Sequence, residues 1–194
     1  MRPYIDERLA RAVEVMRAMA DDATLRAQLE TCAARCIETI ERGGKLLLAG
    51  NGGSAADAQH IAAEFVSRFA FDRPGLPAIA LTTDTSILTA VGNDYGYEKL
   101  FERQIQALGR EGDVFFAYST SGRSPNILAG LREAQARGLF RIGFTGAGGD
   151  DMAPLCDVLL RVPARDTAEI QQGHAVLGHI LCGLVERAVF GARA

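Results

Sequence analysis

A short segment in the middle of the chain carries four hydroxyl side chains within six residues: Ser119, Thr120, Ser121 and Ser124. Pro125 follows and suits the first turn of a helix, which Ser124 is placed to cap. Free backbone N–H groups at a helix start attract anions, and Gly122 lets the loop close around one. A cap needs fewer hydroxyls than this, so we predict a phosphate site. Without the GK[ST] ending of a P-loop, a small monophosphate is favoured over a nucleoside triphosphate.

A second segment, Gly50-Asn51-Gly52-Gly53-Ser54, is rich in glycine. Its glycines permit the backbone to approach a ligand closely. A tight turn capped by Ser54 explains the same residues equally well. The segment alone therefore leaves both interpretations open.

His60 and Glu64 are four residues apart and share one face of a predicted helix. That spacing suits two ligands of one metal ion, or an acid–base pair. It is also typical of an ordinary surface contact. Asp57, one turn earlier, can support His60 or simply be an acidic residue of the first turn.

The last predicted helix carries Gln171, His174 and His179. Gln171 and His179 lie about 12 Å apart along the axis of a straight helix, which hardly brings both to one ion. They meet one ion if neighbouring subunits share the site, or if long side chains reach it from opposite sides. His174 points elsewhere, and we predict a packed or hydrogen-bonded side chain.

Asn93 and Asp94 follow an apolar stretch and form one more polar pair. Such a pair can bind sugar hydroxyls or shape a turn. The sequence does not separate the two roles.

Apolar patterning predicts elements that would position these residues. Two helices are expected over residues 5–42, and residues 44–194 then alternate short apolar strands with helices. The expected strands are 45–50, 78–81, 113–118, 140–145 and 157–162, and the helices are 54–69, 95–108, 124–137 and 167–190. The pattern is typical of an α/β fold in which helices cover both faces of a parallel sheet. We predict a single domain, 1–194, whose ligand lies beyond the carboxyl ends of the strands.

Composition excludes several classes of protein. The formal net charge of −3 gives no support for a nucleic-acid partner. The first residues lack the apolar core of a signal peptide, and no apolar stretch predicts a membrane span. The cysteines Cys32, Cys36, Cys156 and Cys182 show no zinc spacing, and reduced thiols indicate a cytoplasmic protein.

Six segments resemble, in chain order, the phosphoheptose isomerases of the sugar isomerase (SIS) domain superfamily. They are GNGGSAADAQHIAAEF, RPGLPAIAL, VGNDYGYEKLF, GREGDV, STSGRSPN and IQQGHAVLGH, and the match runs from about residue 40 to 190. The resemblance implies a three-layer sandwich around a five-stranded parallel sheet. It also implies a homotetramer with sites at subunit interfaces, and we assign the helices of residues 1–43 to oligomerisation.

The resemblance also implies the roles of individual residues. One Zn²⁺ per subunit is expected on His60, Glu64, Gln171 and His179. Substrate contacts are expected from Asn51, Gly52, Gly53, Glu64, Asn93, Asp94, Ser119, Thr120, Ser121, Ser124 and Gln171. Gln172 stands where a Glu is common in the family, but that position is not part of the implied site.

The implied reaction converts D-sedoheptulose 7-phosphate into D-glycero-D-manno-heptose 7-phosphate through an enediol(ate). It is the first step toward ADP- or GDP-heptose for lipopolysaccharide or capsule. We assign Glu64 and His179 as the acid and the base, with His179 slightly preferred as the base, because a zinc-bound carboxylate is a weaker base.

Three other functions remain to be compared. The chain can isomerise another ketose phosphate, or sense a sugar phosphate without turning it over. It can also be a scaffold like the SIS proteins that associate with the replication initiator. Those proteins lack the residues that match Glu64 and His179, and both are present here, which favours catalysis.

Overall fold

Five short strands form one parallel sheet in the order β2-β1-β3-β4-β5. The strands are β1 (Leu46–Ala49), β2 (Ala78–Ala80), β3 (Val114–Tyr118), β4 (Phe140–Thr145) and β5 (Val158–Arg161). The computed structural model describes residues 1–191 of the chain. In the central register, Leu48 of β1 pairs with Phe116 of β3, which pairs with Ile142 of β4.

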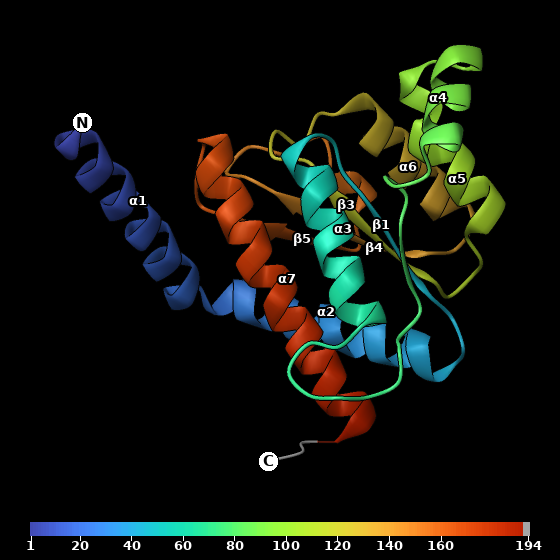
Figure 1. Cartoon of the computed structure of the whole chain (residues 1–194), viewed down its shortest axis with the longest axis horizontal. Helices are drawn as coiled ribbons and strands as arrows, with labels where there is room; N and C mark the ends of the chain where they lie inside the picture. The colour runs from blue at the N-terminus through green and yellow to red at the C-terminus, as the bar shows by residue number, and fades with distance from the viewer. Residues whose placement is uncertain (192–194) are drawn as a thin grey trace.

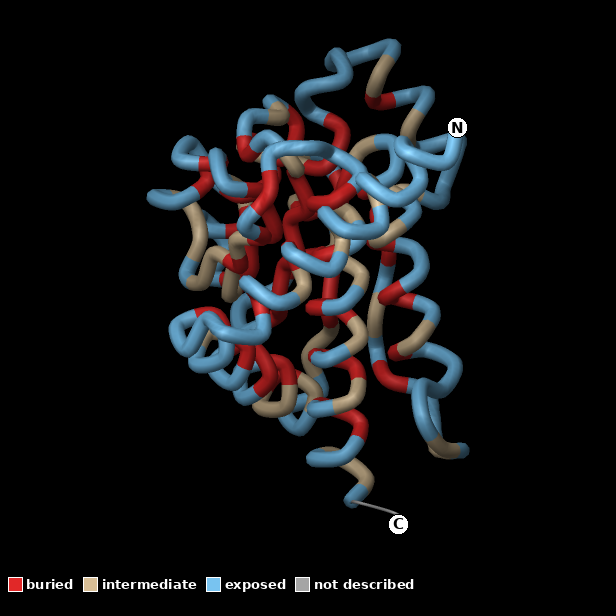
Figure 2. The backbone as a smooth tube through the Cα atoms, turned by 90° about the vertical axis from the view of Figure 1, so that its left-hand side faces the viewer, coloured by how far each residue is buried: buried red, intermediate tan, exposed pale blue. Residues whose placement is uncertain are grey.

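Helices cover both faces of the sheet (Figure 1). They are α1 (Arg2–Asp21), α2 (Ala23–Glu41), α3 (Gly53–Val66), α4 (Thr85–Asp94), α5 (Leu100–Leu108), α6 (Pro125–Ala136) and α7 (Thr167–Phe190). Because side chains alternate along a strand, Leu46 and Leu48 of β1 pack with α2, α3 and α7. Leu47 and Ala49 face the layer that contains α5 and α6. Figure 2 shows the buried segments gathered between these layers.

The predicted fold class is confirmed: a five-stranded parallel sheet in a three-layer sandwich, preceded by a helical pair. All five predicted strands are present, and Asp22 caps the second helix by accepting from the N–H groups of Thr24 and Leu25. The predicted region 44–194 extends to residues 192–194, which lie outside the described residues. No observation divides the chain into the predicted parts 1–43 and 44–194, and α2 shares a core with α3 and α7.

One helix was not predicted, and another begins later than expected. Residues 85–94 form α4, whose start is capped by the Asp84 carboxylate accepting from the N–H of Ile87. Its β-branched residues and Gly92 have low helix propensity, which hides the helix in the sequence. The helix predicted over 95–108 is a 3-10 turn at Tyr97–Lys99 followed by α5.

The N-terminal helix is held to the body mainly at one end. Val15 and Met19 of α1 are buried, whereas its first half is exposed and projects from the body (Figure 1). Arg8 pairs with Asp166 at 3.0 Å and with Glu169 at 3.2 Å, which ties α1 to the start of α7. Helix α1 therefore keeps an apolar surface that this chain does not cover.

Helix α7 closes the fold across the front of the sheet, beside α3 (Figure 1). Among the described residues it is the one helix long and apolar enough to cross a membrane by length and composition. Helices of soluble cores meet the same criterion. Here the buried side of α7 packs on the sheet and on α2 and α3, which accounts for its apolar composition.

A buried ion pair fixes the loop that follows α3. Arg73 donates from Nε to the Glu186 carboxylate at 2.9 Å, and both side chains are almost fully buried. The same carboxylate accepts from the backbone N–H groups of Phe69 and Ala70 at 2.8 and 2.7 Å. Burial alone would raise the pKa of Glu186, but these hydrogen bonds outweigh it and lower the pKa. The loop is thereby anchored to α7.

The strand order places a topological switch point between β1 and β3. The connection after β1 leads to β2 on one side, and the connection after β3 leads to β4 on the other side. This arrangement leaves a crevice beyond the carboxyl ends of β1 and β3. The glycine-rich segment after β1 and the hydroxyl segment after β3 both begin there.

Candidate active site

The loop after β3 is shaped by its own hydroxyl groups. The Oγ atoms of Ser119 and Ser124 lie 2.9 Å apart and share a hydrogen bond. Ser124 occupies the N-cap position of α6, as predicted, but its side chain makes no capping hydrogen bond. Ser121 Oγ accepts from the N–H of Arg123 at 3.2 Å. The loop is thus closed by side chains rather than by a helix cap.

Backbone donors remain available in this loop. Within the described part of the chain, the N–H groups of Thr120, Ser121 and Ser124 have no hydrogen-bond acceptor. Gly122 has φ +67°, and a Cβ there would run into the backbone of Gly149. The loop therefore presents free N–H groups at the start of α6, which is the arrangement that binds a phosphate.

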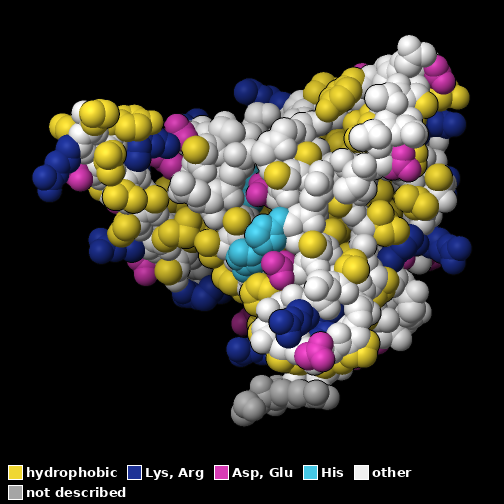
Figure 3. All heavy atoms as spheres, viewed as in Figure 1, with side chains coloured by type: hydrophobic (Ala, Val, Ile, Leu, Met, Phe, Trp, Pro, Cys, Tyr) yellow, Lys and Arg dark blue, Asp and Glu magenta, His cyan; other side chains and the backbone are white. Residues whose placement is uncertain are grey.

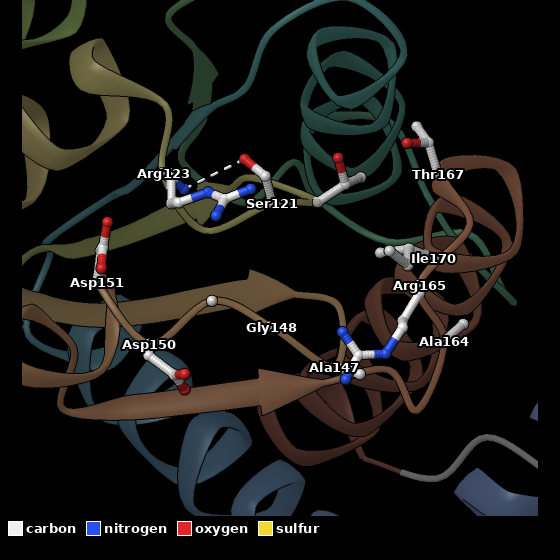
Figure 4. Close-up of a pocket in the computed structure, with 12 residues that line it drawn as sticks. Ser121, Arg123, Ala147, Gly148, Asp150, Asp151, Ala164, Arg165, Thr167 and Ile170 are labelled. Carbon is white, nitrogen blue, oxygen red and sulfur yellow. Dashed lines mark hydrogen bonds between the residues drawn. The ribbon is translucent and has the colours of Figure 1, made fainter.

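A cavity of about 300 Å³ opens on one side of the loop (Figure 4). Thr120, Ser121 and Arg123 line it from the loop, and Arg165 and Thr167 line it from the segment after β5. None of the histidines is among the residues that line it. The cavity offers hydroxyl and guanidinium donors beside the predicted phosphate site.

The turn after β1 is held by an amide pair. Asn51 donates from Nδ2 to Asn126 Oδ1 at 2.8 Å, and Asn126 donates back to Asn51 Oδ1 at 2.8 Å. The Tyr97 hydroxyl donates to the same Asn51 oxygen at 3.1 Å. Gly52, with φ +57°, is the N-cap of α3 and has no side chain to close the helix start.

Gln171 lies against the start of α3. A Cβ on Gly53 would meet Gln171 Nε2 at 2.5 Å, so the Gln171 amide occupies the space that a side chain at residue 53 would take. The Gln171 amide therefore belongs to the glycine turn and stands two helical turns along α7 from His179. In the single chain, Gln171 and His179 are therefore separated along α7, as expected from the sequence.

Two histidines and a glutamate meet between α3 and α7. His60 Nε2 lies 3.0 Å from His179 Nε2 and 3.2 Å from Glu64 Oε1. The three residues can each offer one ligand atom with all such atoms within 4.8 Å of one another. The Phe69 ring packs beside His179 at a centroid distance of 5.6 Å. Histidine side chains are visible on this face beside hydrophobic ones (Figure 3).

Two other titratable groups lie near these elements but are shielded from water. Burial raises the pKa of Asp57 to about 6, and nearby His60 opposes this in part. Burial lowers the pKa of His174 to about 4, and the backbone of Thr145 offsets only part of the shift. Neither His174 nitrogen makes a well-aligned hydrogen bond. His174 is packed against the rings of Tyr118 and Phe144, outside the cluster.

The structure thus brings together some of the predicted site residues and separates others. His60, Glu64 and His179 form one group, and Ser119–Ser124 form another. Asn93 and Asp94 end helix α4 and hydrogen-bond each other at 2.8 Å. Tyr97 and Asn126 were not predicted, because their role depends on contacts between residues far apart in the sequence.

Comparisons with known proteins show the family to which the chain belongs. Residues 9–146 match the SIS domain family. The phosphoheptose isomerase of Burkholderia pseudomallei is 68% identical over 188 residues, which covers 97% of this chain and 95% of the relative. That of Aneurinibacillus thermoaerophilus is 56% identical and covers 98% and 96% of the two chains. The solved structure of phosphoheptose isomerase GmhA from Neisseria gonorrhoeae superposes with a TM-score of 0.89 at 39% identity, covering 95% and 98%.

The fold and the sequence together define a SIS domain protein, with its glycine-rich and hydroxyl-rich loops at the switch point of the sheet. Within that superfamily the chain belongs to the phosphoheptose isomerases. It is accordingly an isomerase, and the alternative of a scaffold without catalysis is not supported.

The buried His174 predicts a stability loss in acid. Its folded pKa of about 4 lies below the ordinary value of 6.5, so the unfolded chain binds a proton first as the pH falls. Stability contributed by neutral His174 is complete above pH 6.5 and declines toward pH 4, by roughly 1 to 3 kcal/mol. Urea unfolding at fixed protein concentration should show that the free energy of unfolding decreases less between pH 6.5 and pH 4 in His174→Phe than in the parent protein. Phe144→Leu disturbs the same packing without a titrating group, and an equal slope in all three proteins would contradict the prediction.

Proposed function

We propose that the chain interconverts D-sedoheptulose 7-phosphate and D-glycero-D-manno-heptose 7-phosphate, with Glu64 and His179 moving the proton. The observation that carries this proposal is the meeting of both side chains at His60 Nε2, within 3.2 Å in each case. One carboxylate and one imidazole beside each other suit general acid–base catalysis.

Moving a carbonyl between adjacent carbons needs a proton removed from one carbon and returned to the other. A base takes the proton from carbon and an acid protonates the carbonyl oxygen, which gives an enediol(ate). The protonated base then returns its proton to the carbon that carried the carbonyl, while the deprotonated acid takes the proton of the other hydroxyl, whose carbon becomes the new carbonyl. We assign these roles to His179 and Glu64, with His179 as the preferred base; each transfers the proton only while it is not a ligand of a bound ion. Phe69 packs against one side of His179 and limits the orientations of its ring.

The hydroxyl loop after β3 would hold the phosphate at the other end of the sugar. The available N–H groups of Thr120, Ser121 and Ser124 and the start of α6 support this assignment. The cluster lies on α3 about 10 Å of helical rise beyond Gly53, so an extended substrate is required to reach both ends. Fixing the phosphate places the reacting carbons near the cluster, which lowers the entropic barrier.

Asn51, Gly52, Gly53, Asn93, Asp94 and Gln171 are proposed to contact the sugar between these two ends. Gln171 lies at the glycine turn, which supports a substrate contact. The Asn51 side chain uses one N–H and its oxygen for Asn126 and Tyr97. Its second N–H and the backbone of the turn are therefore left to contact the sugar.

The histidine–glutamate cluster fits a zinc ion. Neighbouring ligands of tetrahedral zinc, with bonds near 2.1 Å, are about 3.4 Å apart, close to the 3.0 and 3.2 Å seen around His60. Two imidazoles and a carboxylate are suitable zinc donors, and Gln171 is the proposed fourth ligand. When bound, the ion would polarise the substrate carbonyl and stabilise negative charge on its oxygen. In one chain Gln171 stands at Gly53, so its participation requires the site to be shared or its side chain to move.

A homotetramer with sites at subunit interfaces is part of the proposal. Exposed apolar side chains recur at helical spacing on two elements: Tyr4, Ile5, Leu9 and Val13 on α1, and Val176, Ile180 and Leu184 on α7. The stripe on α7 runs beside His179, so another subunit packed there would enclose the cluster. The projecting α1, within residues 1–43, is the proposed main oligomerisation element.

A cytoplasmic location is proposed from the substrate class and from the packing of α7 within the fold. The heptose phosphate produced would serve lipopolysaccharide or capsule synthesis. Neither nucleic acid nor membrane is part of the proposed function.

Replacing the catalytic pair should abolish turnover without unfolding the protein. Glu64→Gln and His179→Gln each remove the proton-transferring group, and we expect a loss of kcat of at least about 100-fold. The assay follows aldose phosphate formed from sedoheptulose 7-phosphate, with circular dichroism and light scattering as checks of fold and assembly. Glu38→Gln removes a carboxylate that pairs on the surface with Arg35 and Arg42 and should leave kcat unchanged. Near-normal turnover in both site variants would contradict the assignment.

The double substitution Ser121→Ala and Ser124→Ala should raise KM by about 10- to 100-fold with little change in kcat, because hydrogen bonds to the phosphate are lost. Ser86→Ala, at an exposed position of α4, is the matched control. Pentulose and hexulose phosphates assayed beside the heptulose test the alternative substrates. An unchanged KM would place the phosphate elsewhere.

His60→Ala should weaken zinc binding by about 100-fold or more, because it removes the donor at the centre of the cluster. Calorimetric titration of metal-free protein with Zn²⁺ measures this independently of turnover. His174→Phe removes a histidine outside the cluster and should bind zinc as the parent protein does. Equal affinity in all three proteins would exclude the proposed ligands.

A further inference from the structure

The amide pair of Asn51 and Asn126 is the most fully satisfied side-chain contact at the switch point. Each amide donates one hydrogen bond to the other at 2.8 Å, and Asn126 is 2% exposed. Tyr97 adds a third hydrogen bond at 3.1 Å from the 3-10 turn before α5. We call these three residues the amide clasp.

The clasp joins the two loops that the proposed function uses. Asn51 immediately precedes Gly52 and Gly53 at the start of α3, and Asn126 follows Ser124 in the first turn of α6. The residues are 75 positions apart in the chain. A distance between the two helix starts is therefore set by a pair of short, well-aligned hydrogen bonds.

The glycine turn has few other anchors. Gly52 has a positive φ, and the start of α3 has no side-chain cap. The turn is closed by backbone hydrogen bonds from Ser54 to Asn51 and from Ala55 to Gly52. Those bonds shape the turn internally, whereas the clasp attaches it to α6.

We propose that Asn126, assisted by Tyr97, is a positioning residue for the isomerisation. By orienting Asn51 it holds the glycine turn at a fixed distance from the phosphate-binding loop, so that the sugar anchored at one end is presented correctly at the other. This inference rests on the proposed function. Asn126 itself does not contact the substrate.

The role differs measurably from simple stabilisation. Replacing a residue that only stabilises the fold lowers the unfolding temperature and leaves kcat and KM of the folded enzyme unchanged. Replacing a positioning residue leaves phosphate binding intact and lowers kcat, because a small misplacement of the reacting groups lowers the rate by up to about 100-fold.

The chemistry of the pair allows a sharp substitution. In Asn126→Asp, the carboxylate still accepts from Asn51 Nδ2 but cannot donate to Asn51 Oδ1, and two oxygens face each other. A protonated carboxyl group restores the donor. Burial raises a carboxyl pKa, so the protonated form becomes populated in mildly acidic buffer. Of the described residues that hydrogen-bond the pair, Tyr97 is the one titratable group.

We expect kcat of Asn126→Asp to be about 10- to 100-fold below the parent at pH 8. The ratio of variant to parent kcat should rise as the pH falls to 5.5, whereas the ratio for Asn126→Ala should stay flat. Tyr97→Phe, which removes one exposed hydroxyl, should lower kcat by a few fold. Competitive inhibition by inorganic phosphate should be the same in every variant.

The matched control is Gln104, another buried amide, which donates to the backbone carbonyls of Leu81 and Leu100 at 2.9 and 3.2 Å. Gln104→Glu introduces a similar buried carboxylate away from the clasp and should lower the unfolding temperature without a pH-dependent change in the kcat ratio. A flat Asn126→Asp ratio, or one that follows Gln104→Glu, would overturn the proposal. If Asn126→Ala does not fold, Asn126→Asp and Tyr97→Phe decide the question.

The measurements distinguish failure of the proposed reaction from failure of the positioning role. If the parent protein does not turn over sedoheptulose 7-phosphate, the proposed reaction is wrong whatever the variants do. If the parent is active and Asn126→Asp has parental kcat at pH 8, the reaction stands and the clasp has no positioning role.

Discussion

The close packing of α3 against α7 is the contact on which the candidate catalytic group depends. The two helices run side by side in the same direction, and Gly178 lies so near Ile61 that a Cβ there would meet its Cδ1 at 2.6 Å. The Ile61 side chain thus fills the space beside this glycine, next to His60 and His179, whose Nε2 atoms lie 3.0 Å apart. The packing of α3 against α7 thereby brings together two histidines that are 119 positions apart in the chain.

The same pair of helices relates the catalytic group to the rest of the site. At its start α3 touches Gln171, and near its end the buried Arg73–Glu186 pair anchors the following loop, with Phe69 beside His179. The sheet contributes the second half of the site, because β1 and β3 end next to each other. The hydroxyl loop, the glycine turn and the histidine–glutamate cluster are thus each held in place by their own contacts.

The sequence was sufficient for the sheet and for the type of chemistry, but not for the contacts between distant segments. The strands were predictable because each is a short, mostly apolar run. The central strands β1 and β3 are buried throughout, whereas Ile79 of the edge strand β2 is exposed. Helix α4 was hidden by residues of low helix propensity that packing and the Asp84 cap compensate. His60 and Glu64 share a face by spacing alone, whereas His179 joined them only through the family resemblance. Tyr97 and Asn126 gave no local signal, since each matters only through Asn51.

The proposed phosphate site in the loop after β3 has a consequence for how the anion would be held. Its donors are Ser and Thr hydroxyls, backbone amides and the fixed dipole of α6, and the adjoining cavity adds the guanidinium groups of Arg123 and Arg165. The hydroxyls and amides are uncharged donors. The affinity of the loop for phosphate would therefore depend on the ionisation of the phosphate itself, whose second pKa is about 6.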